Sequence, residues 1–243
     1  YKKSTSNIEY EFKIPYKIFR NRIDMVQTDY IVANVDTQTI TNKNKYINSI
    51  INVPIIMTET KSVEKSINSI ITNEIMEFYN KSKSEAENYL KNNIDNELKF
   101  IANTNFEVKK NSNNMLSIIV TYTKYSGGVH NEYENRGYNV YMPNGQFLNL
   151  SDLFKDNVDY KSVINDEIRR QIEELVKKNP ENGQIYQFST IKDNQKFYIQ
   201  DDNLVIFFDL YEIAPYPAGI PEFKINIKTI SHILKDEYID IFK

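Results

Sequence analysis

The chain has 243 residues, of which 40% are hydrophobic and 13% aromatic, enough apolar material to form a core in one large domain or two small ones. Cysteine is absent, which excludes disulfides, thiolate nucleophiles and cysteine-based zinc sites. Residues 1–120 carry 16 Lys and Arg against 14 Asp and Glu, whereas residues 121–243 carry 14 against 19, so the second half is acidic. An acidic surface is a poor partner for nucleic acid and attracts basic proteins.

The first sixty residues predict strands. Apolar and polar side chains alternate over 8–14 and 30–39, the period of a half-buried strand, and 46–57 is a third candidate. Pro15 marks an edge or a bend, and Pro54 argues that the third strand lies at a sheet edge, because proline has no N–H for a ladder.

The period changes after residue 58. From about Glu59 to Asn92, apolar residues recur at three- and four-residue spacing, opposite a face of Lys, Glu, Ser and Asn. This pattern predicts one long amphipathic helix. Its polar face mixes both charges without a basic cluster, so we expect the helix to face a core rather than a membrane surface.

Two further strands, 98–109 and 115–125, are joined by an Asn-rich turn and predict an antiparallel hairpin. Alternation continues from Tyr138 to a Pro-Asn-Gly turn, after which Phe147 begins a short returning strand. Ser151 is expected to cap a helix, and a second amphipathic helix is predicted from about Asp159 to Lys178.

The last part of the chain predicts a hairpin of 197–200 and 204–210, a strand over 222–227 and a short helix over 229–234. The second hairpin strand is apolar on both faces, which is typical of a central strand. The fold class expected is therefore α+β, with antiparallel β-sheets each packed by a long helix. We place the domain seam between Asn92 and Glu97, giving an N-terminal domain of residues 1–95 and a C-terminal domain of 96–243 that carries the motifs below, the two packed as one unit.

Three segments are specific enough to indicate a family: YSGGVHN at 125–131, NVYMPNGQFLNLSDLF at 139–154 and YEIAPYPAGIPEF at 211–223. Together they resemble the paired exported domains of lysozyme-sensing anti-sigma-V factors. The same domains occur ahead of the catalytic domain of membrane-anchored peptidoglycan deacetylases, and the first of them is a deacetylase-associated domain. The resemblance covers almost the whole chain, although the first sixty residues match only in pattern.

The resemblance implies a receptor. The extracellular domain would capture lysozyme, a basic protein, and binding would expose a membrane-proximal segment to signal peptidase, which starts the release of a sigma factor. The chain does not begin with Met and has no run of 18 apolar residues, so we expect Tyr1 to be a cut end. The missing parts would be a transmembrane anchor, which holds the domain on the extracellular face of the cell membrane, and a cytoplasmic segment that binds the sigma factor. A sensor of this kind also predicts a segment near residues 1–16 whose packing changes on binding.

The residues expected to contact the partner lie in two loops that we place together at one end of the sheet. They are Ser126, Gly127, Gly128 and His130 in the first motif, and Pro215, Tyr216 and Pro217 in the proline-rich motif. Proline leaves little conformational entropy to lose on binding, and a tyrosine in a partner pocket is an efficient anchor. Tyr211 and Phe223 are expected to point into the core.

The sequence does not predict an enzyme, a metal site or a cofactor. Its two histidines, His130 and His232, are about a hundred residues apart, which excludes the usual metal spacings. Ser126 beside His130 lacks the nucleophile-elbow pattern, so a structural hydrogen-bonding role is expected for His130. Three acidic pairs occur, at 132/134, 173/174 and 201/202. Glu173 and Glu174 are expected on the polar side of a helix and Asp201 and Asp202 in a turn, so we do not expect a pair of carboxylates facing each other across a cleft.

Two other functions remain open. The chain could be a non-catalytic module that binds cell-wall glycan, with tyrosine-rich loops stacking on sugars, as the deacetylase architecture implies. A hydrolase with an unrecognised site would need turnover by the isolated domain.

Overall fold

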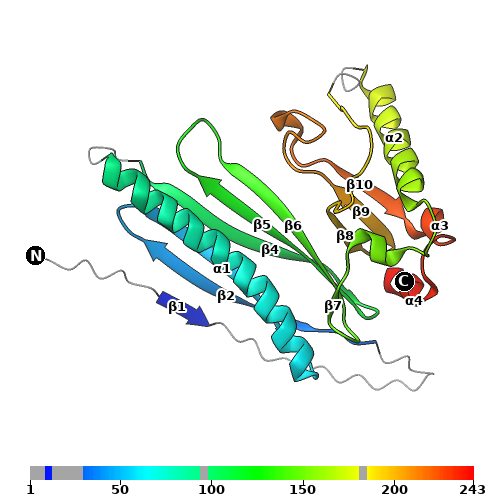
Figure 1. Ribbon diagram of the computed structural model, residues 1–243, viewed down its shortest axis with the longest axis horizontal. Coiled ribbons are helices and arrows are strands. Elements are labelled where there is room, and N and C mark those ends of the chain that lie inside the picture. The colour runs from blue at the N-terminus through cyan, green and yellow to red at the C-terminus, as the bar shows by residue number, and fades with distance from the viewer. Residues whose placement is uncertain (1–8, 13–29, 94–97, 181–184) are drawn as a thin grey trace, which may run out of the picture. The chain divides into compact units, whose positions relative to one another are not determined.

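The computed structural model in Figure 1 describes residues 9–12, 30–93, 98–180 and 185–243. Within these ranges the fold is α+β, as expected. The strands are β1 (Glu9–Phe12), β2 (Asn34–Lys43), β3 (Ile47–Met57), β4 (Phe100–Ser112), β5 (Met115–Tyr125), β6 (Glu132–Tyr141), β7 (Gln146–Phe147), β8 (Phe197–Gln200), β9 (Asn203–Phe207) and β10 (Glu222–Asn226). The helices are α1 (Lys61–Asn92), α2 (Tyr160–Lys178), α3 (Ile227–Ile230) and α4 (Asp236–Ile239), with short 3-10 turns η1 (Leu150–Leu153), η3 (Tyr216–Ala218) and η4 (Asp240–Phe242).

The strands form two sheets. The first has the order β1-β2-β3-β4-β5-β6-β7 and the second the order β10-β9-β8. All the strand pairs with a defined register are antiparallel except β3 and β4, which are parallel from Ile47 beside Phe100 to Ile51 beside Thr104. The expectation of purely antiparallel sheets was wrong at this pair, because α1 is a crossover connection that returns the chain to the end of the sheet where β3 began.

The chain divides into two compact units. The first contains residues 1–106 and 120–133, and the second contains residues 107–119 and 134–243. Strands β4, β5 and β6 each contribute residues to both units. The domain division at the seam between Asn92 and Glu97 stays a prediction, since 94–97 lie outside the described residues.

Helix α1 covers one face of the first sheet, over β2, β3 and β4 (Figure 1). Its buried residues follow the expected spacing, with two small residues, Ser82 and Ala86, before the last one, Leu90. They are Ile67, Ile71, Ile75, Tyr79, Ser82, Ala86 and Leu90. Phe78 meets Tyr122 of β5 edge-on at 5.0 Å, and Glu85 pairs with Lys124 at 2.5 Å, so this face of β5 also contacts the helix.

Two expectations about the first strands need correction. β2 begins at Asn34 and ends at Lys43, at each end four residues later than the alternation suggested, and it pairs with β3 from Asn34 beside Met57 to Lys43 beside Asn48. Pro54 does not make β3 an edge strand, since β3 lies between β2 and β4. The β4 pairing ends at Ile51, so the absent N–H of Pro54 costs no bond there, and the Asn68 amide of α1 bonds both the N–H and the C=O of Ile56 instead.

The turn between β4 and β5 confirms the predicted hairpin. Asn113 and Asn114 have φ of 52° and 63°, the left-handed conformation that asparagine tolerates better than other side chains. The Asn113 side chain also donates to the carbonyl oxygen of Lys243 at 2.5 Å, and Lys110 Nζ donates to the same oxygen at 3.3 Å and to that of Asp201 at 2.8 Å.

The second sheet carries the larger hydrophobic cluster. β9 is its central strand, as the apolar run predicted, and Ile206, Phe208 and Phe223 are nearly or fully buried there. Ile164 and Ile168 of α2 belong to the same cluster, whereas Leu175 and Val176 near the end of this helix are half-exposed. The free edge of β8 is bonded by side chains: Ser117 Oγ accepts from Ile199 N at 3.0 Å, and Asn139 Nδ2 donates to the Phe197 oxygen at 2.8 Å.

The predicted helix cap after β7 was wrong by two residues. Asn149, not Ser151, caps η1, and its main-chain N–H donates to the Asp152 carboxylate at 2.7 Å in a capping box. The turn begins two residues earlier than expected, so the capping box joins Asn149 to Asp152. The short helix expected over 229–234 is α3, which likewise starts two residues earlier at Ile227.

Across the part of the chain that the structure describes, no helix combines the length and apolar character needed to cross a bilayer.

Candidate functional site

The first-motif loop, residues 125–131, joins β5 to β6 within the first unit. Gly127 and Gly128 have φ of 98° and 123°, a conformation that strains other residues. A Cβ on Gly127 would also stand 3.0 Å from Cδ2 of Leu98. Tyr125 Oη donates to the Gly128 oxygen at 3.2 Å and holds the loop closed. The two glycines thus allow the loop to bend, and Gly127 lies against the Leu98 side chain.

The exposed tip of this loop is Val129. Its side chain is 89% exposed, the largest value among the exposed large hydrophobic residues. His130 is also exposed and Ser126 is half-buried, so both reach solvent. Val129 was not among the expected contact residues. The feature of the sequence that could have indicated it is a bulky apolar side chain in an otherwise small and polar turn.

The proline-rich loop, residues 211–221, belongs to the second unit and is closed by main-chain hydrogen bonds. Phe208 N donates to the Pro221 oxygen at 3.1 Å across its base, and within it Ala218 N and Gly219 N donate to Pro215 and Tyr216 at 2.9 Å. Pro215 and Pro217 are exposed and Tyr216 is half-exposed, so all three have surface available for a partner. A contact role for these residues and for the first-motif loop stays a prediction. The two loops lie in different units, and their proximity also stays a prediction.

Tyr211 points the opposite way from the expectation. Phe223 is 2% exposed, as predicted, but Tyr211 is 68% exposed and its ring lies 5.8 Å from that of Tyr216, tilted by 34°. The reason is the main chain: Tyr211 has φ of 65°, and the turn closes through Glu212 N to the Asp209 oxygen at 3.1 Å. Left-handed backbone at this place turns the side chain away from the core.

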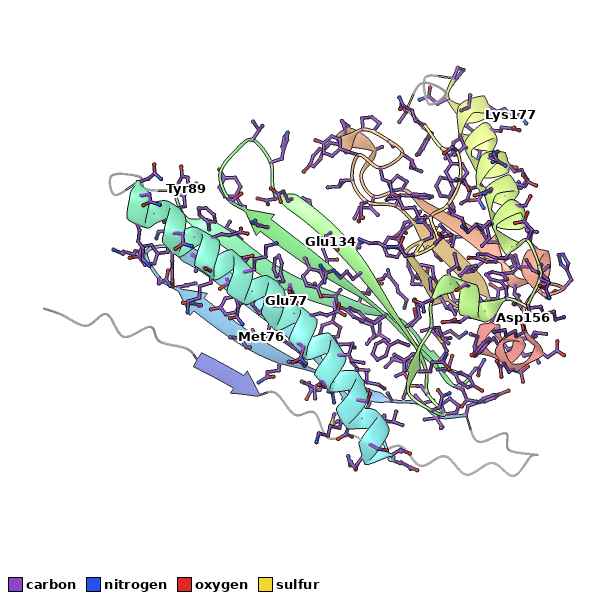
Figure 2. All side chains as sticks on the ribbon, viewed as in Figure 1. Met76, Glu77, Tyr89, Glu134, Asp156 and Lys177 are labelled. Atoms are coloured by element: carbon purple, nitrogen blue, oxygen red, sulfur yellow. The ribbon has the colours of Figure 1, made fainter. Side chains whose placement is uncertain are left out.

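Charged side chains lie beneath this loop in the same unit. Lys196 Nζ bonds Asp209 at 2.8 Å and Glu134 at 3.3 Å, and Lys192 Nζ bonds Glu212 at 2.8 Å. Glu134, labelled on β6 in Figure 2, also accepts from Arg136 at 2.8 Å. Partial burial opposes its ionisation, but Arg136 and Lys196 outweigh that effect and lower the pKa of the carboxyl.

Glu212 links these charges to the turn. One of its oxygens accepts from Asp209 N at 2.8 Å while the other pairs with Lys192, and the side chain is only 15% exposed. The hydrogen bond that Lys192 donates to the Glu212 carboxylate raises the pKa of Lys192. The base of the proline-rich loop is thus fixed by two ion pairs as well as by the main chain.

The other acidic pairs lie where the sequence placed them. Glu173 and Glu174 are exposed on α2, with Glu174 paired to Arg170 at 2.5 Å, and Asp201 and Asp202 occupy the β8–β9 turn. Within the described ranges, no three His, Asp or Glu side chains converge in a way that could hold a metal ion.

Two stretches of the chain match known protein families. Residues 40–132 match the family described as deacetylase PdaC, and residues 151–228 match the family described as a protein of unknown function, DUF3298. The chain is 37% identical over 113 residues to the anti-sigma-V factor RsiV of Bacillus subtilis, covering 43% of this chain and 39% of the relative. It is 22% identical over 220 residues to the peptidoglycan-N-acetylmuramic acid deacetylase PdaC of the same organism, covering 90% of this chain and 45% of the relative.

The fold has solved counterparts. A crystal structure of a DUF3298 family member from Bacteroides fragilis matches 98% of this chain and 99% of its own, with a TM-score of 0.64 at 18% identity. A DUF3298 family protein from Pseudomonas aeruginosa matches 85% of this chain and 94% of its own, with a TM-score of 0.60 at 14% identity. By sequence the chain is similar to RsiV and to PdaC, as its motifs indicated, and it spans less than half the length of either.

Proposed function

We propose that the chain is the lysozyme-binding sensor region of a membrane-anchored anti-sigma factor. Binding on the extracellular side would permit signal peptidase to cut a membrane-proximal segment and so lead to release of a sigma factor. The chain itself would be non-catalytic. The similarity to RsiV supports this proposal, and the motif-based resemblance supplies the partner and the cleavage.

The main structural support is the proline-rich loop. Its base is fixed by hydrogen bonds and ion pairs, its prolines limit the main chain, and Tyr216 is partly exposed at its tip. A loop that is already ordered loses little entropy on binding, and tyrosine is among the residues that anchor interfaces best. We include Ser126, Gly127, Gly128 and His130 of the first-motif loop in the same binding surface.

Charge supports a basic partner. The unit that carries the proline-rich loop has 15 Lys and Arg against 19 Asp and Glu, a net charge of −4, whereas the other unit has 15 against 14. Long-range attraction to a basic protein would speed association and would weaken as salt rises.

Calorimetric titration with hen-type lysozyme at low and high salt tests the proposal. We expect one-to-one binding that weakens in salt, and a loss of about 2 kcal/mol in binding free energy for Tyr216→Ala. Tyr89→Ala is the matched control, because Tyr89 is a 38% exposed tyrosine on α1 (Figure 2) outside both loops. Absence of heat with the wild-type chain at either salt concentration would reject the lysozyme sensor.

A second candidate is a non-catalytic module that binds cell-wall glycan. The observation in its favour is that the similarity to PdaC extends over 90% of this chain, more than twice the share covered by the RsiV match. Saturable binding of muropeptides together with no binding of lysozyme would favour this candidate.

A further inference from the structure

Tyr211 occupies a place in the turn that favours glycine. The turn runs from Asp209 to Glu212 and closes with Glu212 N donating to the Asp209 oxygen at 3.1 Å. Tyr211 is its third residue and has φ of 65°, the conformation that makes glycine or asparagine the usual choice there. A tyrosine at this position strains the main chain.

Burial of the Tyr211 side chain does not offset the strain. The Tyr211 side chain is 68% exposed, so it buries little apolar surface, and its ring contact with Tyr216 at 5.8 Å joins two surface residues. Strained non-glycine residues on a surface loop persist where the side chain serves a function. Tyr211 therefore has the character of a binding residue rather than a folding residue.

The two rings define what they can bind. Their centroids are 5.8 Å apart and the planes are tilted by only 34°, so one cation placed over their exposed faces can lie within the cation–π range, about 6 Å, of both rings. The two carboxylates of the turn, Glu212 and Asp209, are already paired with Lys192 and Lys196, whereas the Tyr211 ring is 68% exposed. A guanidinium suits this surface, because it is flat, weakly hydrated and stacks on aromatic faces.

We propose that Tyr211 and Tyr216 form an aromatic platform that binds an arginine side chain of the basic partner, and that Tyr211 is a specificity-determining residue. The inference rests on the proposed function, since it names the chemistry that the proline-rich loop recognises. It adds a residue that the sequence had assigned to the core, and it names the partner group as a cation.

Tyr211→Gly separates binding from folding. Glycine relieves the positive φ and removes the ring, so we expect the melting temperature to stay the same or rise while the affinity for hen-type lysozyme falls about tenfold. A residue retained for packing would give the reverse, a lower melting temperature with unchanged affinity, and that result would overturn the inference.

Two further variants test the cation. Tyr211→Phe keeps the aromatic face and should bind within about threefold of the wild type, whereas Tyr211→Leu keeps apolar bulk without a π face and should weaken binding about tenfold. Equal binding by the Leu and Phe variants would overturn the arginine assignment. Lysozyme with its arginines blocked by cyclohexanedione should bind the wild type and Tyr211→Gly with equal, weaker affinity, whereas lysozyme with acetylated lysines should still distinguish them.

The outcomes separate this inference from the proposed function. If wild-type chain binds lysozyme and Tyr211→Gly binds it within twofold, the sensor proposal stands and the platform is rejected. If wild-type chain binds no lysozyme, the sensor proposal fails and the platform fails with it.

Discussion

Gly137 of β6 passes the main chain of Phe197 so closely that a Cβ on Gly137 would stand 2.2 Å from the Phe197 carbonyl oxygen. That distance is shorter than any non-bonded contact allows, and the obstacle is main chain that cannot rotate away. Glycine at 137 therefore sets how near β8 approaches β6 within the second unit.

Gly137→Ala should be one of the most destabilising substitutions in the chain. We expect a loss of about 3 kcal/mol in the free energy of unfolding, because β8 must shift to accommodate the methyl group. Gly219→Ala is the matched control: its φ is 71° but no atom lies within 4 Å of the added Cβ, so strain alone should cost about 1 kcal/mol. Urea unfolding of both variants measures the difference, and equal losses would show that β8 can move without cost.

The approach of Gly137 allows a buried hydrogen-bond chain. Ile199 N donates to Ser117 Oγ at 3.0 Å, Ser117 Oγ donates to Asn139 Oδ1 at 2.7 Å, and Asn139 Nδ2 donates to the Phe197 oxygen at 2.8 Å. Ser117 and Asn139 are 0% and 3% exposed. These side chains bond main-chain groups of β8 that no strand of its own sheet pairs on this side.

Asn139→Asp tests this chain of hydrogen bonds, because the two side chains have almost the same shape. At pH 7 a carboxylate cannot donate to the Phe197 oxygen and places a charge in a buried site, so we expect a loss of about 3 kcal/mol or more. Burial raises the pKa of such a carboxyl, and its protonated form can donate again. The deficit relative to wild type should therefore be smaller at pH 4 than at pH 7 in urea unfolding, and a deficit independent of pH would contradict this account.

The features that sequence predicted are those fixed by neighbours in the chain. The spacing of Ile67, Ile71 and Ile75 identified α1, and the Asn113–Asn114 turn identified the hairpin, because both depend on local periodicity and local backbone preference. The apolar run in β9 identified a central strand for the same reason.

The features that sequence missed depend on distant contacts. The need for Gly137 arises from Phe197, sixty residues later, and Pro54 is tolerated in an inner strand because the pairing of β3 with β4 ends at Ile51. Tyr211 was assigned to the core because it is aromatic, yet its direction is set by a turn closed by Asp209 and Glu212. The parallel pair of β3 and β4 likewise follows from where the end of α1 returns the chain.

Asn42 and Tyr79 form a buried polar contact between β2 and α1. Asn42 Nδ2 donates to Tyr79 Oη at 2.7 Å, and the residues are 1% and 6% exposed. Asn42 Oδ1 has no hydrogen-bond partner among the described residues. This contact therefore leaves one buried acceptor already unsatisfied.

Tyr79→Phe should destabilise the chain by about 1–3 kcal/mol, because it leaves the Asn42 amide donor buried without this acceptor. Adding Asn42→Leu, a side chain of similar shape, should recover most of the loss, since both polar groups are then gone. Urea unfolding of the single and double variants gives the comparison. If the double variant were no more stable than Tyr79→Phe alone, the polar contact would not be the source of the loss.

The ionised Glu134 side chain should make a small contribution to the stability of the fold that is lost in acid. Its pKa is lowered in the folded state, where Arg136 and Lys196 outweigh the opposing effect of partial burial. A carboxyl with a lowered pKa stabilises the fold above the ordinary glutamate pKa of about 4.3, and this contribution is lost as pH falls through the lower folded value. Because the Glu134 side chain is 43% exposed, solvent screening limits the contribution to about 0.5 kcal/mol.

Glu134→Gln should therefore melt about 1–2 °C below wild type at pH 7, and the gap should close as the pH is lowered below 4. Glu132→Gln is the matched control, an exposed carboxylate on the same strand for which we expect no comparable gap at pH 7. Melting curves of the three proteins from pH 3 to pH 7 make the comparison. A Glu134→Gln deficit that grew toward low pH would reverse the sign of this linkage and show that burial, not Arg136 and Lys196, controls the carboxyl.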